Sequence, residues 1–74
     1  MILKEKMAVK MTDGSTHIVE KIKNINGKDV ALLLSLDDFV LRFAIEDDKA
    51  DRNNLIFETD KEKILKLAEE FDKN

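Results

Sequence analysis

The chain has 74 residues, about half the length of an ordinary domain, so we expect a single domain over residues 1–74. Leu, Ile, Val and Phe supply 24 residues, enough to bury a hydrophobic core. The chain has no Cys and only one His, which excludes a disulfide framework, a thiolate metal site and a histidine cluster. Its net charge of −3 is divided unevenly, with +3 over residues 1–28 and −6 over residues 29–74.

Charged residues near the N-terminus predict the cellular compartment. Lys4, Glu5 and Lys6 stand where a signal peptide would need an apolar run of at least about 7 residues. No apolar run approaches the roughly 20 residues that a membrane span requires. We therefore expect a cytoplasmic protein that does not enter a membrane.

The first eleven residues alternate between apolar and polar, the pattern of a strand with one face in water. The apolar positions are Leu3, Met7, Val9 and Met11, and the lysines between them are Lys4, Lys6 and Lys10. Asp13-Gly14 predicts a two-residue hairpin turn, which would pair Val9 with Ile18 and Met11 with Thr16. A second strand is expected from about residue 15 to residue 25.

This second segment also fits a helix. Its apolar residues have the spacing of one helical face, and a helix beginning near Ser15 would end at Gly27: Ile18, Val19, Ile22 and Ile25. The β-branched content favours the strand, although residues 15–26 fit either structure.

The clearest pattern follows the Asn26-Gly27 turn signal, in residues 29–46. A turn at Asp37-Asp38 places the large apolar residues opposite one another on one face: Leu36 with Phe39, Leu34 with Leu41, Leu32 with Phe43 and Val30 with Ile45. The opposite face carries Leu33 and Val40 among smaller and charged residues. The hairpin is therefore expected to be partly buried on both faces.

The rest of the chain predicts a loop, a short strand and a helix. Residues 46–54 are almost entirely polar, and residues 55–57 resume as a strand. Thr59 and Glu62 have the capping-box spacing, so a helix is expected from about residue 60 to residue 72. Its apolar stripe consists of Ile64, Leu67, Ala68 and Phe71.

The order of these elements predicts an α+β fold, a small antiparallel meander of four or five strands with one C-terminal helix packed on it. One helix covers one face of the sheet, so Leu33 and Val40 need other cover. Either the sheet curls into a barrel-like form, or a partner covers them.

No motif predicts catalysis, a metal ion or a cofactor. Setting Asp47 at the first position of a calcium loop places Lys49 and Arg52 where a ligand and a glycine are required. His17 is expected to be exposed beside the first turn and lacks a second group for chemistry. We therefore expect a protein that is not an enzyme and binds no cofactor.

The leading hypothesis is a non-catalytic protein-interaction module that self-associates or docks on a partner through the 29–46 hairpin, with Leu33 and Val40 at the contact. A first alternative is a nucleic-acid-binding accessory protein that uses Lys4, Lys6, Lys10, Lys21 and Lys23. Against it, all four Phe are assigned to the core, which leaves no ring for base stacking. A second alternative is a small acidic inhibitor of a basic nucleic-acid-binding surface, with an acidic patch formed by Asp37, Asp38, Glu46, Asp47, Asp48 and Asp51.

Overall fold

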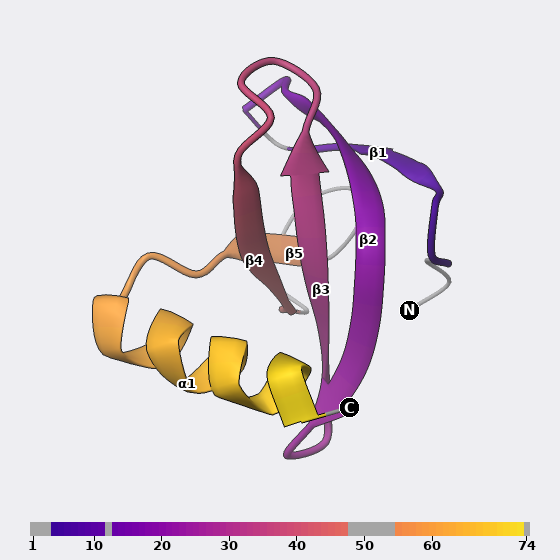
Figure 1. The fold of residues 1–74 in the computed structure, drawn as a ribbon. Coiled ribbons are helices and arrows are strands. Elements are labelled where there is room, and N and C mark those ends of the chain that lie inside the picture. Colours follow the sequence, from indigo (N-terminus) through magenta and orange to yellow (C-terminus); the bar gives the residue numbers. More distant parts are fainter. Residues whose placement is uncertain (1–3, 12, 48–54, 74) are drawn as a thin grey trace.

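A computed structural model describes residues 4–11, 13–47 and 55–73 and confirms the α+β prediction. Within these residues, five strands follow one another in an antiparallel meander, and one helix comes last. The elements are β1 (Ala8–Lys10), β2 (Thr16–Ile25), β3 (Lys28–Ser35), β4 (Leu41–Glu46), β5 (Leu55–Phe57) and α1 (Lys61–Lys73). The sheet is curled into an open half-barrel, and α1 crosses its outer face near the β2–β3 turn (Figure 1).

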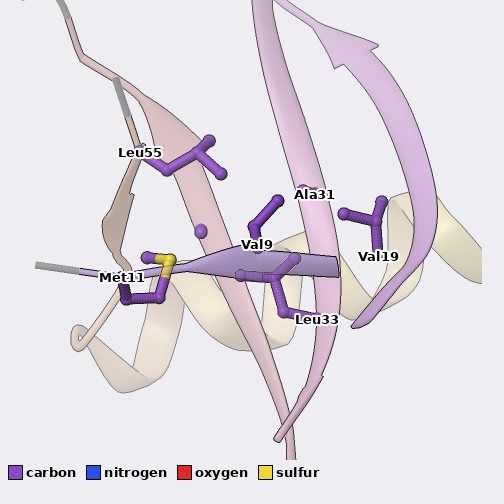
Figure 2. Close-up of a cluster of buried hydrophobic side chains, with 7 residues drawn as sticks. Val9, Met11, Val19, Ala31, Leu33 and Leu55 are labelled. Atoms are coloured by element: carbon purple, nitrogen blue, oxygen red, sulfur yellow. The ribbon is translucent and has the colours of Figure 1, made fainter. Parts of the chain in front are cut away.

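The curl encloses a first hydrophobic core on its concave side. β1 crosses over this side, so that its Val9 packs against side chains of β2 and β3 (Figure 2). Ala31 and Ala44 are direct neighbours at the centre of the sheet, where their small side chains leave room for this close approach. The buried members of the core are Val9, Met11, Val19, Ala31, Leu33, Ala44 and Leu55.

A second core lies between the convex face of the sheet and α1. Leu67 and Phe71 of the helix are buried against Val30, and the rings of Phe43 and Phe71 meet edge to face with centroids 5.1 Å apart. This edge-to-face arrangement is favourable because the positive edge of one ring meets the negative face of the other. Strand β3 is thus buried on both faces, as its sequence predicts.

The second segment is a strand, and a β-bulge explains why its sequence also resembles a helix. Val19 pairs with Leu33 and Lys21 pairs with Leu32, so Glu20 is the extra residue. A bulge reverses the alternation of side chains after it. Val19 and Ile22 therefore both contribute to the concave core although they are three residues apart.

The β2–β3 hairpin turns at the predicted Asn26-Gly27 pair, and the β3–β4 hairpin keeps the predicted register. Asn26 and Gly27 have φ angles of 54° and 83°, as a tight hairpin turn requires. Val30 pairs with Ile45, Leu32 with Phe43 and Leu34 with Leu41, as predicted. The β3–β4 connection is longer than the expected two-residue turn, because Ser35 and Val40 are bonded across the hairpin, with the Ser35 N–H donating to the Val40 carbonyl at 3.0 Å.

The predicted register of the first hairpin is wrong by one residue. Val9 lies opposite His17 and not Ile18, because the connection closes with Met11 N–H donating to the Ser15 carbonyl. A shift of one residue exchanges the two faces of a strand. His17, expected to be exposed, therefore points into the concave core and retains only 1% of its surface exposed.

The helix begins one residue later than predicted, and its cap is a different residue. The Asp60 carboxylate accepts hydrogen bonds from the N–H groups of Glu62 and Lys63 at 2.9 and 3.3 Å. Thr59 is not the capping residue, so the predicted capping box with Glu62 is wrong. An ionised carboxylate is favoured here because it also complements the positive end of the helix dipole.

We expect Leu33→Ala to lower the free energy of unfolding by about 2–5 kcal/mol, since Leu33 is completely buried in the concave core. Leu65→Ala is the matched control, because Leu65 is 57% exposed on α1 and its truncation should change stability by less than about 0.5 kcal/mol. Urea denaturation measures both variants. Equal losses would contradict the enclosed core.

Candidate functional site

The β3–β4 connection is an ordered tip built by short polar contacts. The Ser35 hydroxyl oxygen accepts hydrogen bonds from the N–H groups of Asp37 and Asp38 at 3.1 and 3.4 Å. Asp38 in turn accepts one from the Val40 N–H at 3.0 Å. The Arg42 guanidinium donates two hydrogen bonds to the Asp38 carboxylate, at 2.8 and 3.2 Å. These bonds define the path of the chain through residues 35–42.

Phe39 is the unusual residue of this tip. Its φ angle is 57°, in the left-handed region, and its N–H donates to the Ser35 carbonyl at 3.0 Å. Aromatic residues rarely adopt this conformation, since the Cβ atom then approaches the backbone. The side chain is 73% exposed, although the sequence analysis assigned every Phe to the core. The prediction was wrong because a two-residue turn would have placed Phe39 in the strand.

Phe39 belongs to an exposed apolar surface at the free end of the hairpin, which we call the tip surface. It consists of Leu36, Phe39, Val40 and Leu41, each at least 44% exposed. Leu41 also lines a groove of about 670 Å³ between the sheet and α1, where Ile64 and Ala68 form the helical wall. The helix leaves this end of the convex face uncovered (Figure 1), so the tip surface and the groove are continuous at Leu41.

A polar cavity of about 290 Å³ lies at the same end of the half-barrel. It is lined by Asp13, Ser15, His17, Ser35, Asp37, Asp38, Arg42 and Phe57. The Ser15 hydroxyl donates to Asp13 at 2.5 Å, and its oxygen lies 3.4 Å from Nδ1 of His17. Because the single hydroxyl proton is directed at Asp13, the contact with Ser15 fits the tautomer in which Nδ1 carries the imidazole proton.

This assignment leaves Nε2 of His17 as an acceptor. It is buried and has no hydrogen-bond partner among the described residues. The imidazole packs against the Phe57 ring, with centroids 5.2 Å apart. Burial, and secondly the Arg42 charge, lowers the pKa of His17 below its usual 6.5.

Two carboxylates at the mouth of the cavity, those of Asp13 and Asp38, are stabilised in their ionised form. The hydrogen bonds from Arg42 hold the pKa of Asp38 far below its usual range, and the same bonds raise the pKa of Arg42. The hydroxyl of Ser15 lowers the pKa of Asp13. The lining therefore carries three carboxylates, of Asp13, Asp37 and Asp38, against one guanidinium.

The two predicted contact residues have different positions. Leu33 lies inside the curl with none of its surface exposed, so the sheet itself supplies the cover that the sequence analysis required. In this fold Leu33 therefore has no exposed surface with which a partner could make contact. Val40 is 45% exposed and belongs to the tip surface.

The predicted lysine surface is divided. Lys4 and Lys6 precede β1 and do not share a strand face with Lys10, because the strand begins only at Ala8. Lys21 lines the groove beside α1, and the ammonium group of Lys23 donates to the Glu70 carbonyl near the end of the helix. The described lysines therefore do not form the single face that the nucleic-acid hypothesis assumed.

The predicted acidic patch is only partly described. Asp37 and Asp38 are exposed at the tip, whereas Glu46 ends β4, at the opposite end of that strand. Asp47 follows Glu46, and the predictions for Asp48 and Asp51 lie outside the described residues.

Within residues 4–11, 13–47 and 55–73, no group of three or more His, Asp or Glu side chains is arranged to hold a metal ion. The helix of this part of the chain is too short and too polar to cross a membrane. Comparison with protein-family models, curated proteins and solved structures finds no significant match.

We expect the free energy of unfolding to fall as the pH drops from 7.5 to 5.5. The pKa of His17 is lowered by folding, so below about 6.5 the unfolded chain binds a proton that the folded chain resists. Asp13 and Asp38 do not add to this change. Because folding lowers their pKa values, their contribution to stability stays constant until the pH falls to about 3.8.

Urea denaturation at the two pH values measures the effect, with His17→Phe as the control because it retains a ring against Phe57. The variant should be equally stable at both pH values. The same slope in both proteins would exclude His17 as the cause.

Proposed function

We propose that the protein is a non-catalytic docking module that binds a protein partner through the tip surface. The partner's complementary surface is apolar at its centre and basic at its rim. The observation that carries this proposal is Phe39, an exposed aromatic ring on a residue with a φ angle of 57°.

The conformation of Phe39 is unfavourable for the isolated protein in two ways. The left-handed conformation costs about 1–2 kcal/mol for an L-residue with a side chain. The exposed ring also forgoes the roughly 1.5–3 kcal/mol that burial of a Phe side chain contributes. Asn or Gly would suit this position better, so an interaction made by the ring is the simplest reason for Phe here.

The surroundings of Phe39 favour a protein over a nucleic acid. Asp37 and Asp38 precede it directly, and Asp13 lies at the same cavity mouth. One guanidinium, that of Arg42, stands against these three carboxylates, so the tip attracts basic residues and repels phosphates. Aromatic residues, Phe among them, are also enriched at the centres of protein interfaces.

The neighbouring groove extends the contact area. Leu41 connects the tip surface to the apolar walls formed by Leu32, Ile64 and Ala68. A partner that places one apolar side chain beside Phe39 and another in this groove would be held at two points. This arrangement supports binding of a folded surface or a helix, as at other apolar grooves between elements.

We expect Phe39→Asn to remove partner binding while leaving the fold at least as stable, because Asn tolerates the left-handed conformation. Tagged wild-type and variant proteins are compared in pull-downs from source lysate, with and without nuclease. Leu65→Gln is the control, since it removes an apolar side chain that is 57% exposed outside the tip surface.

A partner that is retained by the wild type and by Leu65→Gln, but lost with Phe39→Asn, supports the proposal. Its retention should also survive nuclease and weaken at high salt. Equal retention by Phe39→Asn and the wild type would overturn the proposal. If the co-purified proteins are lost after nuclease treatment, nucleic-acid binding would be favoured instead.

A further inference from the structure

Strand pairing joins His17 to the tip that carries Phe39. His17 lies directly opposite Ser35, its cross-strand neighbour. The Ser35 hydroxyl accepts the N–H groups of Asp37 and Asp38, and the Ser35 carbonyl accepts that of Phe39. His17 is therefore paired directly with the residue whose hydroxyl and carbonyl oxygens accept the hydrogen bonds of the tip.

Neutral imidazole fits its position, and imidazolium does not. Nδ1 donates to Ser15, while Nε2 is enclosed and has no partner among the described residues. A proton on Nε2 would add a donor and a positive charge beside the Phe57 ring, where the described residues offer this atom no hydrogen-bond partner. A buried charge without a partner is strongly unfavourable, so the ring must move to an acceptor or to water.

The charged groups around the imidazole determine the direction of that movement. Asp13 stands on the connection before β2, Asp37 and Asp38 stand on the tip, and Arg42 stands on β4. The residues that face the imidazole from β1 and β5, Val9 and Phe57, carry no charge. The nearby carboxylates would attract imidazolium toward the cavity mouth, where it competes with Arg42 for Asp38.

We propose that protonation of His17 controls the conformation of the tip, and we call this arrangement the latch. The neutral imidazole maintains the conformation that presents Phe39, and its protonation releases residues 36–40 from that conformation. The consequence for partner binding rests on the proposed docking function, whereas the latch itself is a property of the isolated chain. Mild acid then weakens docking without unfolding the domain.

The sequence makes the latch measurable in the isolated protein. His17 is the only His, so the imidazole gives a single set of NMR signals. Between pH 7.5 and 5.0 exposed Asp and Glu side chains remain mostly ionised. The titration follows the His17 ring protons together with the backbone amide signals of Asp37, Phe39 and Leu67, the last serving as an internal control in α1.

We expect the amide signals of Asp37 and Phe39 to shift with the same midpoint as the His17 ring, below pH 6.5, while that of Leu67 stays constant. In His17→Phe the tip amides should not shift over this range. His17→Gln provides a second variant if His17→Phe does not fold. In the wild type alone, agreement or disagreement between the midpoints of the His17 ring and of the tip amides already tests the proposal.

Three results would overturn the latch. The ring could titrate while the tip amides stay constant, the tip amides could shift equally in the variants, or neither could titrate above pH 5. No partner is present in this experiment, so these results leave the docking proposal intact. Conversely, unchanged pull-down by Phe39→Asn would remove the docking function and leave the latch standing.

Discussion

The rest of the structure depends on the burial of β3 on both of its faces. Leu33 and Ala31 face one side of this strand and Val30 and Leu32 face the other, so the sheet needs two covers. Among the described residues of this 74-residue chain there is one helix, so the curl of the sheet itself covers the second face. The curl brings β1 across the concave side, and α1 covers part of the convex side. The free end of the hairpin, uncovered by either, is where the candidate site lies.

Two local irregularities create that site. The β1–β2 connection is one residue longer than a two-residue turn, which brings His17 to the concave side. The β3–β4 connection ends with Phe39 in the left-handed conformation, which directs its ring away from the strand ladder. Each departs from the most regular hairpin, and both lie at the same end of the half-barrel. Departures from local preference are frequent where a protein binds or switches.

The electrostatic environment of the site links its two parts. Asp37 and Asp38 directly precede Phe39, and their carboxylates also lie at the mouth of the cavity that contains His17. They would attract a basic partner from outside and an imidazolium from inside. Under the two proposals, binding and protonation would involve the same carboxylates, which gives a physical basis for coupling between them.

The sequence by itself left residues 15–26 open between strand and helix, but it determined the order of the other elements, the register of β3 on β4 and the position of α1. It did so because large apolar residues two apart must share a face, and a shift in register would expose Leu32 and Phe43 together. It did not determine the bulge at Glu20, the burial of His17 or the exposure of Phe39. Each of these depends on a connection or a ladder irregularity whose length changes the outcome by one residue, and only packing between distant strands selects among such lengths. Leu33 shows the same limit. The apolar pattern of the hairpin predicted that Leu33 is buried, but only the tertiary structure showed that the curled sheet, and not a partner, buries it.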